Sequence, residues 1–242
     1  MEYNLNNKTI WLTGASRGIG YAIAKRLIDQ DVKLILSSSS KDTLKMLVSE
    51  FKDSNNIFFF PCDVTSKQQV EATYSKIVNT ISKVDVLINN AGVSKFAPFI
   101  DLTYEDFEYM NNVNYKGVFL CSKAVLPAMI EKKNGIIINI LTWAAINIFQ
   151  NSSVYSGSKA AAWVMMKTLR EEVRIENIKV INIHPGATES DMWEESERKE
   201  FGFRMMQPED VAEAVYTTLM LSDTNSRAMI EEIIIRPQLG DL

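Results

Sequence analysis

The feature that most constrains the fold is a strand-like segment, a glycine-rich turn and a helix-like segment that follow one another near the N-terminus. Residues 8–13 predict a strand, and the amphipathic pattern up to about Gln30 predicts a helix. The turn between them reads Thr13-Gly14-Ala15-Ser16-Arg17-Gly18-Ile19-Gly20. Glycines there permit a tight turn and a close approach to a pyrophosphate, to which a helix N-terminus offers free N–H groups. The pattern therefore predicts a dinucleotide site. A structural turn before a helix would leave the same pattern, and the spacing is not the commoner Gly-x-Gly-x-x-Gly.

Along the rest of the chain, strand-like and helix-like segments alternate. Further strands are predicted at 33–37, 57–61, 84–89, 135–141, 178–183 and 230–237. Helices are predicted at 41–51, 66–81 and 103–131, around Tyr155, and at 208–221. Several strands are continuous apolar runs, which is typical of a parallel sheet covered on both faces. We therefore expect an α/β fold of the Rossmann type, a doubly wound parallel sheet of about seven strands. We expect residues 1–242 to form one domain, with a short substrate lid around 188–207.

A second feature is a tyrosine and a lysine one helical turn apart, Tyr155 and Lys159. Bringing a tyrosine pKa from about 10 to roughly 7 takes about 4 kcal/mol. One positive charge at about 4 Å supplies roughly that at an effective dielectric constant of about 20. Tyr21 and Lys25 have the same spacing but lie inside the first predicted helix, behind the glycine turn. Ligands of such sheets bind at the carboxyl ends of the strands, so position favours Tyr155. Either pair could instead lie on a helix surface or pack a tyrosine into the core.

Composition excludes several functions. The net charge of the 242 residues is −4 and the sequence has no basic block, which argues against nucleic acid or an anionic membrane as partner. A single histidine, His184, argues against a histidine metal site or a serine–histidine triad. The two cysteines, Cys62 and Cys121, lie in unrelated contexts and favour a reducing compartment. The polar N-terminus and the absence of a membrane-spanning apolar run lead us to expect a cytoplasmic protein.

Taken together, the motifs resemble the short-chain dehydrogenase/reductase family in its single-domain branch. The resemblance covers nearly the whole chain and rests on four motifs in the family's order and spacing: Thr-Gly-x-x-x-Gly-Ile-Gly at 13–20, Asn-Asn-Ala-Gly at 89–92, Tyr-x-x-x-Lys at 155–159 and Pro-Gly at 185–186. It implies hydride transfer between a nicotinamide dinucleotide and a carbonyl or secondary alcohol, as in the carbonyl and 3-oxoacyl reductases. Lys133 fits the basic sites of acyl-carrier-protein reductases, whereas Glu176 weakens that interpretation.

The resemblance also implies the catalytic residues. Tyr155 would be the general acid/base, and Lys159 would lower its pKa and hold the nicotinamide ribose. Asn114 would position a water in the proton relay, although it could be an ordinary polar residue on a helix. The family's serine is replaced by Thr142, which keeps the hydroxyl but adds a methyl group and a stiffer χ1. We expect activity to survive with a tighter pocket; the other interpretation is a threonine that ends a strand in a degenerate enzyme.

By the same resemblance, three further groups of residues would hold the cofactor. Asp63 and Val64 would bind the adenine, and Asn90, Ala91 and Gly92 would line the adenosine side. Pro185, Gly186, Thr188 and Ser190 would hold the nicotinamide carboxamide. The phosphate turn would contribute Gly14, Ser16, Arg17, Gly18, Ile19 and Gly20.

The choice between the two dinucleotides depends on the end of the second strand. A ribose 2′-hydroxyl calls for an acidic residue there, but the sequence has Ser38 followed by Ser39. Arg17 is placed to pair with a 2′-phosphate. Both features favour NADP(H) over NAD(H).

The substrate and the assembly are predicted more coarsely. The expected pocket walls are apolar and aromatic (Phe96, Trp143, Phe149, Met192 and Trp193), which suggests a hydrophobic ketone, aldehyde or alcohol, although each could pack in the core or lid. An apolar second face of the Tyr155 helix, at 160–162, Trp163 and Met166, leads us to expect a homotetramer, or a homodimer; that face could also pack internally. A catalytically silent dinucleotide-binding sensor or partner-binding protein is the alternative, with Thr142 as the sign of decay. A sugar-nucleotide epimerase or dehydratase would need a substrate domain for which we find no residues.

Overall fold

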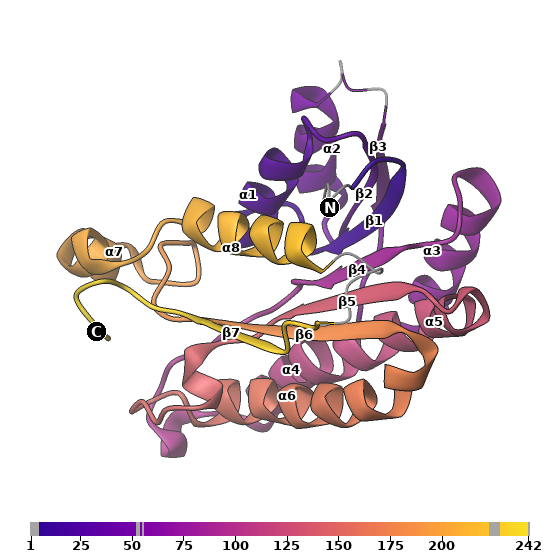
Figure 1. Cartoon of the computed structure of the whole chain (residues 1–242). Coiled ribbons are helices and arrows are strands. Elements are labelled where there is room, and N and C mark those ends of the chain that lie inside the picture. The colour runs from indigo at the N-terminus through magenta and orange to yellow at the C-terminus, as the bar shows by residue number, and fades with distance from the viewer. Residues whose placement is uncertain (1–4, 52–53, 55, 223–227, 242) are drawn as a thin grey trace.

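The computed structural model describes residues 5–51, 54, 56–222 and 228–241, and its centre is a parallel sheet of seven strands (Figure 1). The sheet order is β3-β2-β1-β4-β5-β6-β7. Its strands are β1 (Lys8–Thr13), β2 (Val32–Ser38), β3 (Ile57–Pro61), β4 (Val86–Asn89), β5 (Gly135–Ile140), β6 (Ile178–Pro185) and β7 (Glu232–Ile235). Every neighbouring pair is parallel, and the strand order reverses between β1 and β4. The predicted doubly wound sheet is confirmed.

Helices cover both faces of this sheet (Figure 1). One face carries α1 (Gly18–Leu27), α2 (Lys41–Glu50) and α8 (Pro208–Leu221). The other face carries α3 (Lys67–Thr80), α5 (Gly117–Lys132) and α6 (Ser153–Val173), with α4 (Tyr104–Asn111) beside α6. The short helix α7 (Glu195–Phe201) lies away from the sheet, next to the C-terminal end of the chain (Figure 1).

Two apolar cores follow from the alternation of side chains along the strands. In β5, Ile136, Ile138 and Ile140 pack into the core beneath α1 and α8. Ile137 and Leu141 pack into the opposite core, against α5 and α6. A strand buried on both faces reads as a continuous apolar run, which is why 135–141 could be recognised from the sequence.

Besides shifts of a few residues at element ends, such as β4 and β7, which are shorter than predicted, the structure departs from the predicted elements in three places. The helical region predicted at 103–131 contains a π-helical turn, Asn112–Lys116, between α4 and α5. The polar stretch before Gln207 contains α7, which begins at a capping box formed by Glu194 and Glu197. Strand β6 continues to Pro185 instead of ending at Ile183, because a proline at the end of a strand removes no interior hydrogen bond.

Part of the polar N-terminus, residues 1–4, lies outside the described residues. Within the described ranges, no helix is both long enough and apolar enough to cross a bilayer.

Candidate active site

A cleft of about 950 Å³ opens at the carboxyl ends of the strands. It is bordered by the turn after β1, by the loops that follow β2 to β6, and by the segment around α7. All residues that the sequence singles out for catalysis or cofactor binding line this cleft except Asn114. The site therefore collects side chains from most of the chain at the edge where the strand order reverses.

The glycine-rich turn is built for close backbone contacts. Gly14 has φ +65°, and a β-carbon on it would lie 2.7 Å from the Cα of Ala91. A β-carbon on Gly20 would lie 2.1 Å from the carbonyl oxygen of Gly14. Larger residues are excluded at both positions, whatever the turn binds. No described side chain caps the N-terminus of α1, and the first residues of that helix, Gly18, Ile19 and Gly20, line the cleft.

The Asn-Asn-Ala-Gly motif holds that turn in place. The side-chain amide of Asn90 donates to the carbonyl oxygens of Thr13 (3.2 Å) and Gly14 (2.9 Å). The Thr13 hydroxyl accepts from the backbone N–H groups of Asn90 (3.1 Å) and Ala91 (3.2 Å). The loop after β4 is thus fastened to the loop after β1, across the point where the strand order reverses.

At the end of β2 the cleft is lined by hydroxyl groups. The hydroxyl of Ser38 lies 3.2 Å from that of Ser16 and 3.3 Å from that of Thr43, and it accepts from the backbone N–H of Ser40 (3.3 Å). Ser39 also lines this part of the cleft, and so does Arg17. No described acidic residue forms an ion pair with the Arg17 guanidinium. Thr43 also lines the cleft, although it is not among the residues expected there from the sequence. Ser40 and Thr43 are the N-cap and N3 residues of α2, and this spacing at the start of a predicted helix could have indicated that Thr43 lies close to Ser38 and Ser39.

Asp63 and Val64, after β3, form the next part of the wall. One oxygen of the Asp63 carboxylate accepts from the backbone N–H (2.9 Å) and the hydroxyl (2.8 Å) of Thr65. These bonds fix the carboxylate at the edge of the cleft. Val64 packs against α5, where a β-carbon on Gly117 would lie 2.8 Å from it.

Tyr155 lies near the start of α6 and is almost fully buried, at 8 % exposed. Burial raises the pKa of its phenol above the ordinary value, and the hydrogen bond with the Thr142 hydroxyl acts in the opposite direction. The Lys159 ammonium donates to the carbonyl oxygen of Ile140 (2.9 Å), and burial lowers the Lys159 pKa to about 8. Burial thus dominates the Tyr155 pKa, and the Lys159 ammonium bonds a backbone carbonyl oxygen.

Asn114 lies behind the wall, in the π-helical turn, and is fully buried. Its side chain donates to the carbonyl oxygen of Val93 (2.8 Å) and to the hydroxyl of Ser158 (3.0 Å), and accepts from the N–H of Val93 (2.9 Å). A β-carbon on Gly92 would lie 3.1 Å from the Lys159 Nζ and 3.3 Å from the Asn114 Oδ1. The Asn114 side chain therefore fixes the loop after β4 against α6, within a short distance of Lys159.

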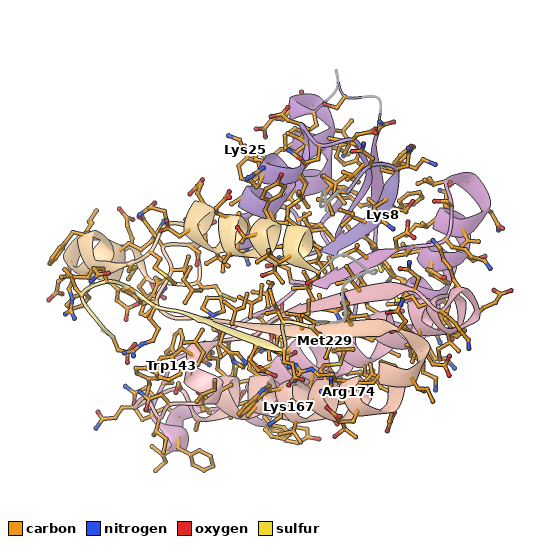
Figure 2. All side chains as sticks on the ribbon, viewed as in Figure 1. Lys8, Lys25, Trp143, Lys167, Arg174 and Met229 are labelled. Atoms are coloured by element: carbon orange, nitrogen blue, oxygen red, sulfur yellow. The ribbon has the colours of Figure 1, made fainter. Side chains whose placement is uncertain are left out.

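The second tyrosine–lysine pair lies outside the cleft. Tyr21 donates a hydrogen bond to Glu50, and that bond, with burial and the charge of Glu50, raises the Tyr21 pKa to about 12. The Lys25 ammonium lies 5.5 Å from the centre of the Tyr21 ring. Figure 2 shows Lys25 on the α1 side of the sheet and Trp143 on the other side, near the C-terminus. Position at the strand ends therefore distinguishes the two pairs, since only Tyr155 and Lys159 line the cleft.

The part of the cleft beyond Tyr155 is aromatic. The ring of Phe96 stacks on that of Trp193 at 5.7 Å and meets Tyr155 edge-on at 5.5 Å. All five expected pocket walls line the cleft. Phe201 and Asp241 line it as well and were not foreseen, since a polar helix and a chain end carry no sequence signal for a pocket. The Trp143 indole donates to Asp241 (3.2 Å), which also pairs with Arg236.

A polar chain tail thus closes one side of the cleft. Among the described residues no group of histidine, cysteine, aspartate or glutamate side chains is arranged to hold a metal ion.

Comparison with known proteins places the chain in a family. The family model described as short chain dehydrogenase matches residues 8–200. A sepiapterin reductase of Chlorobaculum tepidum is 34% identical over 96% of this chain and 96% of its own length. An uncharacterised oxidoreductase of Staphylococcus haemolyticus is 32% identical over 96% of this chain and 98% of its own. The closed form of serine dehydrogenase complexed with NADP+ superposes with a TM-score of 0.89 at 27% identity, covering 97% of this chain and 96% of that one. The chain is an oxidoreductase that belongs to the short-chain dehydrogenase/reductase family.

Proposed function

We propose that this oxidoreductase transfers a hydride between NADP(H) and a carbonyl compound or the corresponding secondary alcohol, in the manner of a carbonyl or 3-oxoacyl reductase. The single observation that carries the proposal is the arrangement of Tyr155, Thr142 and Lys159 in the same cleft as the glycine-rich turn. Bound in this cleft, NADPH would supply the hydride. Tyr155 donates the proton to the carbonyl oxygen, and Thr142 orients that oxygen by a hydrogen bond. A phenol with a raised pKa stays protonated at neutral pH and is available as an acid.

The residues present fit the dinucleotide. The turn at 14–20 would hold the pyrophosphate on backbone N–H groups at the start of α1. Asp63, Val64 and the loop 90–92 would hold the adenosine, and Lys159 the nicotinamide ribose. Pro185, Gly186, Thr188 and Ser190 would hold the carboxamide. A β-carbon on Gly186 would lie 2.9 Å from Pro237, which supports a close-packed backbone at this position.

The preference for NADP(H) is supported by the end of β2. The hydroxyl cluster of Ser16, Ser38 and Thr43 places donors without a carboxylate where the adenosine ribose would lie. Arg17 can add a bidentate ion pair to a 2′-phosphate. The NADP+ in the serine dehydrogenase neighbour is in line with this preference.

The substrate is proposed to be a small hydrophobic ketone or aldehyde. The stacked Phe96 and Trp193 give the cleft a flat apolar wall beside the phenol of Tyr155.

We propose that 188–207 closes over this region as a lid, within a single domain of 1–242. Two free, buried cysteines support the proposal of a cytoplasmic location. We also propose a homotetramer, or a homodimer. The face expected to form it, at 160–162, Trp163 and Met166, is largely used within the chain, because Ala162 and Met166 are buried in the core and Trp163 packs against it. We therefore place the contact on exposed apolar side chains of α4, α5 and α6.

The experiment is a panel of aromatic and aliphatic ketones, aldehydes and acyl thioesters, with sepiapterin included, assayed for carbonyl-dependent NADPH oxidation. We expect turnover with hydrophobic carbonyls, and smaller kcat/KM values with charged ones. NADPH binding without turnover of any carbonyl would contradict the proposal and favour a silent dinucleotide-binding protein.

A further inference from the structure

Neither Phe96 nor Trp193 takes part in the proton transfer proposed for this cleft, yet their rings form a wall of it. Phe96 comes from the loop after β4 and Trp193 from the segment before α7, and their planes are inclined by 20° with the ring centres 5.7 Å apart. A centre distance in this range belongs to an offset stack, in which each ring leaves part of its face uncovered. We call these two rings the aromatic pair; together they present a flat π surface to the cleft.

Hydrogen bonds fix the ring of Trp193. Its indole N–H donates to the carbonyl oxygen of Thr188 (3.0 Å). Thr188 is paired with Met206 in a parallel bridge. The backbone N–H of Met206 donates to Ala187 (3.0 Å), and its carbonyl oxygen accepts from Glu189 (2.8 Å). Because both bonds lie on one side of the segment, the carbonyl of Thr188 faces the opposite side, where it meets the indole. The chain itself therefore orients the indole ring.

The ring of Phe96 lies on a segment that is bonded on both sides of it. Val93 exchanges two hydrogen bonds with the buried side chain of Asn114 (2.8 and 2.9 Å). The backbone N–H of Ala97 donates to the carbonyl oxygen of Asn151 (2.9 Å). Because both rings of the aromatic pair are already in position, little conformational entropy is lost when a ligand packs on them.

The aromatic pair begins directly beside the group that is proposed to donate the proton. The ring of Phe96 meets that of Tyr155 edge-on, with the ring centres 5.5 Å apart and the planes at 70°. A ligand ring that lies on the pair therefore has the Tyr155 phenol next to it, which is where the reacting carbonyl belongs. A planar ring stacks on such a surface over a whole face, whereas a saturated ring of the same size is puckered and does not.

We propose that Trp193 and Phe96 are specificity-determining residues that bind a planar conjugated ring next to the reacting carbonyl carbon. The substrate class is then aryl and heteroaryl ketones and aldehydes, ahead of alkyl carbonyl compounds of the same size. This inference rests on the proposed carbonyl reductase function and narrows its substrate. The indole N–H of Trp193 has its own share in the selectivity, since the bond to Thr188 sets where the ring lies.

A binding experiment without turnover tests this preference. Benzyl alcohol and cyclohexylmethanol share one carbon skeleton, and NADPH cannot oxidise either, so each forms an unreactive complex with the NADPH-bound protein. Burial of apolar surface alone favours cyclohexylmethanol, which has the larger apolar surface. We expect benzyl alcohol to bind about twofold to tenfold more tightly, which is the contribution of one aromatic pair. Equal Kd values, or tighter binding of cyclohexylmethanol, would overturn the proposal.

Two substitutions separate the ring of Trp193 from its hydrogen bond. Trp193→Leu removes the π surface, so the preference for benzyl alcohol should disappear. Trp193→Phe keeps a ring but loses the bond to Thr188, so the preference should fall to an intermediate value. A Trp193→Leu protein with the full parent preference would overturn the role of Trp193. A Trp193→Phe protein with the parent preference would refute the share assigned to the indole bond.

Two further variants complete the set. Trp163→Phe loses an indole N–H bond outside the cleft, to Glu232 (3.1 Å), and should keep the parent preference. If Trp193→Leu does not fold, Phe96→Leu serves in its place, because it removes the other half of the aromatic pair. An undiminished preference in Phe96→Leu would contradict the proposal in the same way.

Nuclear magnetic resonance locates the bound ring. The four tryptophans yield four indole N–H signals, and the one missing from Trp193→Phe belongs to Trp193. Benzyl alcohol added to the NADPH complex should shift this signal through its ring current, and cyclohexylmethanol should shift it much less. A Trp193 signal that benzyl alcohol leaves unchanged would show that the ring binds elsewhere, and would overturn the proposal.

Kinetics connect this binding to the reaction. The ratio of kcat/KM for acetophenone to that for cyclohexyl methyl ketone should fall in Trp193→Leu by about twofold to tenfold, and the intrinsic reactivities of the two ketones cancel in the comparison with the parent. An unchanged ratio would refute the role in specificity. A parent protein that binds NADPH but reduces no carbonyl would refute the proposed function, while the alcohol titrations would still decide whether the aromatic pair binds planar rings.

Discussion

At the scale of single residues, the site depends on two buried groups whose pKa values move in opposite directions. Burial disfavours the charged form of either group, so it raises the Tyr155 pKa and lowers the Lys159 pKa to about 8. The sequence indicated that these residues belong together, but it could not indicate how deeply each is buried. Spacing along a helix fixes a shared face, whereas burial depends on the strands and loops packed against that face.

The Lys159 pKa predicts how NADPH affinity depends on pH. Below about pH 8 the side chain is an ammonium that can bond the ribose hydroxyls, and above that pH it becomes a neutral amine. We expect the NADPH Kd, measured by nicotinamide fluorescence, to rise from about pH 7 to about pH 9.5. In Lys159→Met the Kd should be higher and independent of pH in this window. A parent Kd that stays constant across it would contradict the assignment.

Cofactor preference is a second prediction at this scale. In Ser38→Asp, a carboxylate enters the hydroxyl cluster, where it would accept from a ribose 2′-hydroxyl and repel a 2′-phosphate. The ratio of kcat/KM for NADPH to that for NADH should fall by roughly tenfold to a hundredfold, as one or two such interactions are exchanged. Ser54→Asp, a change at a position outside the cleft, serves as the control. An unchanged ratio would contradict the choice of NADP(H).

At the scale of elements, the described C-terminal residues act as one wall of the cleft. Asp241 accepts from the Trp143 indole (3.2 Å) and from Arg236 (3.1 and 2.7 Å), while its backbone carbonyl accepts from Arg204 (2.7 Å). The guanidinium of Arg236 lies 4.8 Å from the centre of the Trp143 ring. The end of the chain therefore connects the loop after β5 with the segment after α7.

Removing the Asp241 carboxylate should loosen Trp143 without reaching the phosphate turn. In Asp241→Ala we expect the substrate KM to rise about fivefold, the equivalent of roughly one hydrogen bond of about 1 kcal/mol, with the NADPH Kd unchanged. Asp191→Ala is the matched control, since Asp191 also lines the cleft but is largely exposed. Equal KM values for the two variants would show that Asp241 does not support the pocket.

At the scale of the whole molecule, the sequence predicted the sheet well and the details of the site unevenly. Apolar runs such as 135–141 and the glycine-rich turn are local signals, so the strands and the turn could be predicted without knowing which segments pack against them. The π-helical turn at 112–116 could not, since one shifted hydrogen bond leaves no mark in the periodicity. The contact of His184 with Thr142 joins residues 42 positions apart, and that of Asp241 with Trp143 joins residues 98 positions apart. No local sequence pattern predicts such contacts.

The assembly is the remaining prediction at this scale. Exposed apolar side chains lie on α4, α5 and α6, among them Phe107, Phe119 and Val164. We expect light scattering to give a mass near four times 27.4 kDa, or twice that value for a dimer. Val164→Glu should dissociate the assembly, whereas Met46→Glu, at a still more exposed apolar position on α2, should leave it intact. A monomeric mass for the parent protein would contradict the proposal.

The central claim is that Tyr155 passes a proton to a carbonyl compound in the cleft that holds the dinucleotide. The most direct measurement compares the parent protein with Tyr155→Phe, which keeps the aromatic ring beside Phe96 and removes only the hydroxyl. Carbonyl-dependent NADPH oxidation is followed together with the NADPH Kd. The account predicts that kcat falls by a factor on the order of 10² to 10⁴ while the Kd stays within about twofold. A Tyr155→Phe protein that retains the parent kcat would contradict it.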